Sequence, residues 1–199
     1  MSDATPENAG AGAPVKKRAV APYIASAVGV LLVAFLAMLA FADPNRSDTA
    51  QSPLLGKPAP EVKSTLIDGG TFDLSRRKGS WIVLNFFNST CVPCRQEHSL
   101  LVDFAAEQKT SDDPVELYTV VNDDTDEAVK AFFDTNGGNW PKIHDDNGSI
   151  SVAFGVAKVP ESWVIDPDGY VRMRVIGALS EGFLTTRIDA LKRQYAGQS

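Results

Sequence analysis

The sequence predicts an α/β domain with a mixed central β-sheet flanked by helices, preceded by one N-terminal transmembrane helix. Three observations support this fold class. Residues 19–42 form an uncharged apolar run, strand-like and helix-like segments alternate from residue 81 onward, and a strong turn signal separates the last two strand-like runs. Strands joined through a helix are normally parallel, whereas a hairpin adds antiparallel strands. The sheet should therefore be mixed.

The N-terminal 55 residues are predicted to lie outside the folded domain. Residues 1–18, rich in small residues and ending in three basic ones, are interpreted as a disordered cytoplasmic tail. Residues 19–42 are 24 consecutive residues without a charge. As a helix this run would span roughly 36 Å and cross a bilayer core of about 30 Å. Residues 43–55 have the composition of a linker, which leaves 56–199 for the domain.

The flanks of the apolar run predict its orientation. Basic residues precede the run and Asp43 follows it. This pattern predicts that the N-terminus lies on the cytoplasmic side of the cell membrane and the domain on the outer side. A cleaved signal peptide is the alternative, because the sequence AFA at 40–42 fits cleavage after Ala42. Both interpretations make the domain extracytoplasmic. The formal net charge of -6 argues against nucleic acid as a partner.

The first half of the domain predicts strands alternating with helices. The run WIVLNFF at 81–87 has the continuous apolar character of a buried central strand, and an amphipathic helix is predicted over 94–109. Residues 115–122 are rich in β-branched residues, which favours a second core strand. Acidic residues open the segment 123–138 and Gly137 lies at its end, as expected for a helix.

The second half predicts a hairpin and a final helix. A short segment at 149–156 leads to two strand-like runs separated by DPDG at 166–169, a turn signal. In the second run, apolar residues alternate with Arg172 and Arg174, so one face should pack and the other should be solvated. In 180–195 the apolar residues fall on one helical stripe.

The two cysteines of the chain, Cys91 and Cys94, allow three interpretations. A disulfide staple would close a loop too short to constrain the unfolded chain much. A zinc site would need three or four protein ligands, and His98 and His144 are the only histidines. We favour a redox centre, because a cysteine at a helix N-terminus is stabilised as a thiolate by unpaired N–H groups and the helix dipole.

The redox interpretation gives each cysteine a role. Cys91 would attack a disulfide of a partner, and Cys94, one turn into the helix, would attack the resulting mixed disulfide. Pro93 in the first turn costs no helical hydrogen bond. Because Val92 and Pro93 bring no charge that would stabilise the thiolate further, a reductant is expected rather than a strong oxidant. This chemistry requires no metal or other cofactor besides the cysteine pair.

Over about residues 54–195 the chain resembles the membrane-tethered thioredoxin-like proteins of the TlpA, ResA and CcmG (DsbE) family. The resemblance rests on three stretches of sequence: GKPAPEV, VLNFFNSTCVPCRQEH and FGVAKVPESWVIDPDGYV. The CRQEH continuation and the VPE step are most similar to CcmG. The resemblance implies a thioredoxin-like fold and thiol:disulfide oxidoreductase activity.

The resemblance also implies roles for residues distant from the cysteines. Pro160 matches the family's cis-proline, although the sequence alone is equally compatible with an ordinary strand-entry residue, and Val159 would offer a backbone group to the substrate. Glu161 is expected to take protons or to raise the pKa of Cys91, with an exposed strand carboxylate as the alternative. Asn85 stands six residues before the first cysteine, where the CcmG group has Asn.

The implied function is to keep the CxxCH cysteines of exported apocytochrome c reduced so that haem can attach. A membrane electron carrier of the CcdA or DsbD type would supply the electrons. Thr90 stands where the family usually has Trp, and with Pro93 it belongs to the expected substrate surface, so the choice of substrate stays open. The alternatives are a general thiol reductase or isomerase of exported proteins and a Sco-like copper chaperone using His144, although Sco proteins usually have CxxxC spacing.

Overall fold

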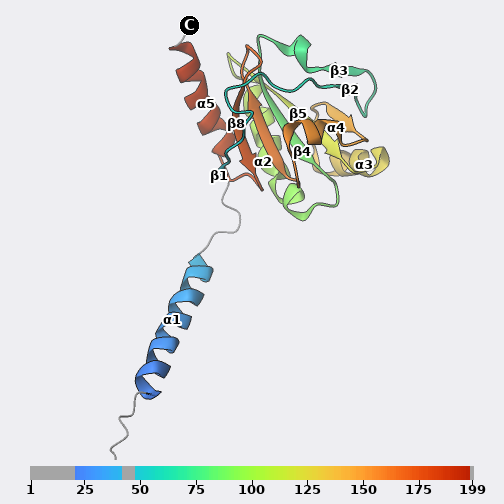
Figure 1. The fold of residues 1–199 in the computed structure, drawn as a ribbon. Coiled ribbons are helices and arrows are strands. Elements are labelled where there is room, and N and C mark those ends of the chain that lie inside the picture. The colour runs from blue at the N-terminus through green and yellow to red at the C-terminus, as the bar shows by residue number, and fades with distance from the viewer. Residues whose placement is uncertain (1–20, 42–47, 198–199) are drawn as a thin grey trace, which may run out of the picture. The chain divides into compact units, whose positions relative to one another are not determined.

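The computed structural model describes residues 21–41 and 48–197 (Figure 1). The chain divides into two units, residues 1–43 and 44–199. In the first unit, helix α1 spans Ala21–Phe41. Among the residues described, no helix combines the length and the apolar character needed to cross a membrane. The predicted tail at 1–18 and the cleavage position after Ala42 lie outside the described residues.

The second unit is built on a six-stranded sheet of order β1-β8-β7-β4-β5-β6. Its strands are β1 (Asp48–Thr49), β4 (Trp81–Phe87), β5 (Val115–Asn122), β6 (Lys142–Asp145), β7 (Glu161–Ile165) and β8 (Val171–Ile176). Strands β4, β5 and β6 are parallel to one another, and β7, β8 and β1 follow in antiparallel pairs. The predicted mixed sheet is confirmed.

Helices and a small hairpin cover the two faces of this sheet. The remaining elements are the hairpin strands β2 (Lys63–Thr65) and β3 (Thr71–Asp73), the 3₁₀ helix η1 (Leu74–Arg77), and the helices α2 (Val92–Gln108), α3 (Asp126–Asn136), α4 (Ser149–Phe154) and α5 (Phe183–Ala196). Helices α2, α3 and α5 contribute apolar side chains to one core cluster. The hairpin, η1 and α4 contribute to the other.

Strand β4 lies in the middle of the sheet and leads directly to the cysteines. All seven of its residues are buried, because its neighbours β5 and β7 occupy both edges and core clusters occupy both faces. This accounts for the continuous apolar run. Val83 and Phe87 belong to the cluster that contains α2, whereas Leu84 and Phe86 belong to the opposite cluster. Asn85 is the one polar residue of the strand.

The structure differs from the sequence-based expectation at three places. Strand β1 pairs with β8 within the segment expected to be a linker. Strand β6 was not predicted, because it has only four residues and three of them are polar. The face of β8 that carries Arg172 and Arg174 is solvated only in part: their side chains are 32% and 15% exposed. Arg174 is the less exposed of the two, because the chain after β1 crosses it at Gln51.

Candidate active site at the disulfide

Cys91 and Cys94 lie where β4 leads into α2, and they form a disulfide with Cα atoms 5.3 Å apart. Cys91 is the N-cap residue of α2, and its sulfur accepts a hydrogen bond of 3.2 Å from the backbone N–H of Cys94. Cys91 is partly exposed and Cys94 is fully buried. A partner's disulfide can therefore reach the sulfur of Cys91 and not that of Cys94.

The loop before β7 lies against Cys91. The Val159–Pro160 peptide bond is cis, as the resemblance implied. The carbonyl oxygen of Val159 is 3.6 Å from the sulfur of Cys91, close enough for a weak hydrogen bond when that sulfur is a thiol. Pro160 is buried and Val159 is partly exposed. The structure thus brings Cys91 and Val159 together on one accessible surface, with the buried Pro160 next to Val159 in the chain.

Thr90 is exposed beside Cys91, but its backbone N–H and its hydroxyl form hydrogen bonds within its own loop. Its backbone N–H and its hydroxyl both donate to Oδ1 of Asn88, at 2.8 and 2.6 Å. The amide of Asn88 in turn donates to the carbonyl oxygens of Asn122 and Asp123 at the end of β5. Asn88 therefore ties the loop of Cys91 to the neighbouring loop, and the Thr90 hydroxyl is engaged within its own loop.

A buried glutamate, Glu97, lies on the same face of α2 as Cys94. The two residues are three positions apart in the helix and both are buried, so their Cβ atoms are roughly 5–6 Å apart. The Glu97 carboxylate accepts hydrogen bonds from the amide of Asn85 at 2.9 Å and from the backbone N–H of Leu179 at 2.8 Å. Burial raises the pKa of Glu97 to about 7, and these two hydrogen bonds oppose the rise only in part.

Asn85 links Glu97 to strand β7. Its amide nitrogen donates to Glu97 and also to the hydroxyl of Ser162, at 3.1 Å. Its Oδ1 atom is buried without a hydrogen-bond partner among the described residues. A protonated Glu97 can donate to a carbonyl-type oxygen, whereas an ionised one can only accept. The three side chains thus form a buried polar group on the α2 side of the sheet that can take up or release a proton.

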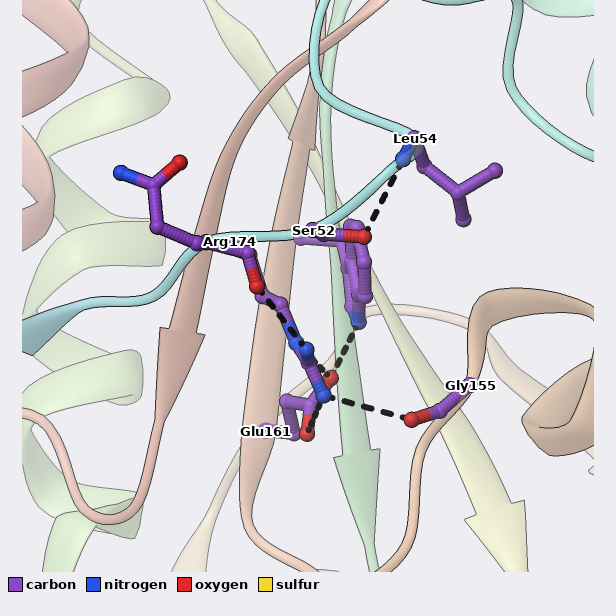
Figure 2. Close-up of polar contacts among 7 residues, drawn as sticks. Ser52, Leu54, Gly155, Glu161 and Arg174 are labelled. Carbon is purple, nitrogen blue, oxygen red and sulfur yellow. Dashed lines mark hydrogen bonds and ion pairs between the residues drawn. The ribbon is translucent and has the colours of Figure 1, made fainter.

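Glu161 is also buried, but its contacts are different (Figure 2). Its carboxylate accepts two hydrogen bonds from the guanidinium of Arg174, at 2.8 and 3.1 Å, and one from the indole N–H of Trp163 at 2.8 Å. Trp163 belongs to the core cluster opposite α2. The structure therefore does not bring the Glu161 carboxylate to the cysteines. The alternative of an exposed strand carboxylate is wrong, since Glu161 is 1% exposed.

Both histidines are engaged by contacts of their own. Nε2 of His98 lies 2.9 Å from the carbonyl oxygen of Gly137, and burial lowers the pKa of His98. Four aromatic side chains surround its ring: Phe87, Phe132, Phe133 and Trp140. The ring of His144 contacts Thr65 and Asp126. In the described ranges, no group of three or more His, Cys, Asp or Glu side chains is placed to hold a metal ion.

Glu97 is the functional candidate that the sequence interpretation missed. The signal was present, because Cys94, Glu97, Leu101 and Phe104 follow one another at spacings of three, four and three residues. This is the periodicity of one helix face, and the apolar members of the series mark that face as buried. A glutamate in such a series must be buried too, and a buried carboxyl without a cation has a raised pKa.

Comparisons with known proteins agree on the family. The model of the AhpC/TSA family matches residues 55–174. The thiol:disulfide interchange protein HelX of Rhodobacter capsulatus is 33% identical over 152 residues, which cover 75% of this chain and 81% of HelX. The thiol-disulfide oxidoreductase ResA of Bacillus anthracis is 33% identical over 134 residues, 65% of this chain and 76% of ResA.

A solved structure gives the same result. The structure of MTB dsbF in mixed oxidized and reduced forms has a TM-score of 0.61 and 27% identity, and the match covers 67% of this chain and 98% of that one. The Cys91–Cys94 disulfide lies inside the residues that the family model matches. The chain therefore belongs to the AhpC/TSA family and is a thioredoxin-like thiol-disulfide oxidoreductase of the HelX and ResA type.

Proposed function

We propose that this protein reduces the disulfide of the CxxCH motif in exported apocytochrome c. The observation that supports a reductase most directly is the pairing of a reachable Cys91 with a buried Cys94 beside an acid whose pKa is about 7. No charged side chain lies between the cysteines to stabilise the thiolate further. An oxidising exterior removes the free thiols that thioether formation needs, so such a substrate requires a dedicated reductant.

The proposed exchange begins with the reduced protein. The Cys91 thiolate attacks one sulfur of the substrate disulfide, and the other substrate sulfur leaves as a thiolate that takes a proton. The Cys94 thiol loses its proton, and its thiolate attacks the Cys91 sulfur of the mixed disulfide. The Cys91–Cys94 disulfide forms and the second substrate sulfur leaves and is protonated. The substrate gains two electrons and two protons in total.

Glu97 is the proposed acceptor of the Cys94 proton. Cys94 is fully buried, so its thiol cannot release a proton to bulk water directly. The carboxyl of Glu97 lies on the same helix face, and its pKa of about 7 lets it take and return a proton near neutral pH. Asn85 is proposed to hold this carboxyl in place through its amide group.

The N-terminal segment is proposed to place the domain at the outer surface of the cell membrane. The support is the uncharged run 19–42, with basic residues before it and Asp43 after it. The oxidised protein would be reduced again by a membrane electron carrier of the CcdA or DsbD type. Such a carrier would transfer two electrons and two protons to the Cys91–Cys94 disulfide by a second thiol exchange.

Trapping of partners tests this proposal. In Cys94→Ala, the mixed disulfide formed through Cys91 cannot be resolved, so the full-length variant should be isolated in covalent complex with its substrate. A c-type apocytochrome should be identified among the partners by mass spectrometry after non-reducing separation. The double variant Cys91→Ala and Cys94→Ala is the control and should trap nothing.

The same experiment separates the proposal from a broader activity. A set of trapped exported proteins that contains no c-type cytochrome would contradict the proposed substrate and favour a general thiol reductase or isomerase. A reduction potential as high as about -120 mV, the value of a strong oxidant, would contradict the direction of the reaction. Either result would leave the thiol-disulfide exchange itself intact.

A further inference from the structure

Arg174 of β8 makes hydrogen bonds to three residues, of which Gln51 is far in the sequence from the other two. Besides Glu161, its guanidinium donates to the carbonyl oxygen of Gly155 at 3.2 Å and to that of Gln51 at 3.3 Å. It also lies over the Trp163 ring, 5.1 Å from the ring centroid. Figure 2 shows Arg174 between Glu161 on one strand and Gly155 on the loop. The guanidinium of Arg174 thus donates four hydrogen bonds in total to these acceptors.

Two of these contacts hold the two ends of one loop. Gly155 follows the last residue of α4, and Glu161 is the first residue of β7. The loop between them carries Val159, whose carbonyl oxygen lies 3.6 Å from the sulfur of Cys91. Within the loop, Pro160 accepts a backbone hydrogen bond from Gly177. A guanidinium can hold both ends because its donors form a rigid planar fork.

We propose that Arg174 is a positioning residue for thiol-disulfide exchange: it holds both ends of the 155–161 loop and so fixes the Val159 carbonyl against Cys91. In this arrangement, the buried Glu161 carboxylate is the counter-charge of Arg174. The inference uses the exchange chemistry of the family and does not depend on apocytochrome c as the substrate.

The position of the Val159 carbonyl has two chemical consequences. Its oxygen is the negative end of a dipole and can accept a hydrogen bond from a Cys91 thiol, so it favours the thiol over the thiolate. The same backbone lies where a substrate chain must lie when its disulfide meets Cys91, so it orients that chain. Release of the loop should therefore lower the pKa of Cys91 and slow the reduction of a protein disulfide.

The contact with Gln51 connects Arg174 to the chain that follows β1. Gln51 follows β1, and the hydroxyl of Ser52 accepts the N–H of Leu54 to close a turn after it. The backbone N–H of Ala50 donates to the carbonyl oxygen of Arg174. Arg174 thus joins the beginning of the domain to the loop beside the disulfide through direct hydrogen bonds.

The variant Arg174→Lys tests the inference in the full chain. Lysine keeps a positive charge beside Glu161 but offers a point charge that cannot reach Gly155 and Gln51 together. Reduction of insulin disulfides should slow by about tenfold. The pKa of Cys91 in the reduced protein, measured from the pH dependence of iodoacetamide alkylation, should fall. A small reagent needs no docking surface, so alkylation at neutral pH should not slow.

Arg172→Lys is the matched control, because Arg172 lies on the same face of β8 and pairs with a buried carboxylate, Asp166, that is not part of the loop. It should match the wild type in both measurements. If Arg174→Lys does not fold, the double variant Glu161→Gln and Arg174→Gln removes both buried charges and should give the same two changes. Equal insulin rates and equal Cys91 pKa values in wild type and either Arg174 variant would overturn the inference.

Discussion

Two glutamates with the same exposure lie on opposite sides of the sheet and have opposite surroundings. Glu97 and Glu161 are each 1% exposed. Glu97 receives hydrogen bonds from one amide and one backbone N–H, and no cation in the described part of the chain pairs with it. Glu161 receives three, two of them from Arg174. Burial alone therefore does not identify the acid that can exchange a proton, because the presence or absence of a counter-charge decides it.

The difference also separates two tasks, proton exchange and the holding of backbone segments, of which the family resemblance implied only the first for Glu161. Glu161 was expected to act on the proton of Cys91, whereas its carboxylate is fully occupied by Arg174 and Trp163. Glu97 lies on the helix that carries Cys94 and has a pKa near neutrality. The Glu97 carboxyl is thus suited to proton exchange, and the Glu161 carboxylate, through Arg174, is suited to holding backbone segments in place.

The largest expected effect comes from breaking the ion pair. Arg174→Ala leaves the buried Glu161 carboxylate without its cation, and the free energy of unfolding at pH 7 should fall by about 3–5 kcal/mol. Urea denaturation measures this change. Arg187→Ala, which removes an exposed arginine of α5, should change the free energy by less than about 0.5 kcal/mol. Similar losses in both variants would mean that the counter-charge of Glu161 does not matter.

The second effect concerns the pH dependence of stability. The pKa of Glu97 is about 7 when folded, against a reference value of 4.5. Between these pH values the folded state keeps a proton that the unfolded state loses, so this group makes the protein less stable as pH rises. The decrease should be about 3 kcal/mol in total, since one pKa unit corresponds to about 1.4 kcal/mol.

Glu97→Gln should remove that decrease. Urea denaturation of the oxidised protein at pH 4.5 and at pH 8 gives the change for each variant, and subtraction from the wild type isolates Glu97. Glu107→Gln, an exposed substitution on the same helix, should retain the wild-type profile. If Glu97→Gln and the wild type lost equal stability over this range, the pKa of Glu97 could not be raised as described.

The smallest expected effect is a change in the pKa of Glu97. Asn85→Ala removes a donor that lowers the pKa of Glu97, so this pKa should rise above about 7, by roughly one unit. Carbon-13 NMR titration of the glutamate carboxyl measures it. Ser162→Ala, which alters a partner of Asn85 but not of Glu97, should leave the value near that of the wild type. An unchanged pKa in Asn85→Ala would show that the amide does not stabilise the ionised form.

The parts of the fold that follow from periodicity could be predicted from the sequence. Strands 81–87 and 115–122 have the observed bounds, because a strand buried on both faces is mostly apolar and β-branched residues favour strands. Strands β1 and β6 could not be predicted in this way. Their two and four residues are too short to show a period, and tertiary pairing with β8 and β5 defines them.

The site was predictable where chemistry depends on local sequence and unpredictable where it depends on packing. The redox disulfide follows from the spacing of the two cysteines, and the cis bond before Pro160 follows from the family resemblance. The pairing of Glu161 with Arg174 joins residues 13 positions apart across two strands. Alternation along β8 could show only that Arg174 faces away from Val175. What covers that face is the chain around Gln51, which carries no recognisable pattern.

The two edge strands of the six-stranded sheet, β1 and β6, offer little free edge to another chain. Strand β1 has only two residues, and β6 is partly covered by Leu66, next to β2, which pairs with Ile143. An open edge would accept an extended polypeptide as an added strand. A thiol-disulfide oxidoreductase with such an edge would retain a substrate chain, or aggregate with it, along that edge. Short and partly covered edges leave a substrate chain mainly the surface beside the disulfide, and that contact can end when the thiol-disulfide exchange is complete.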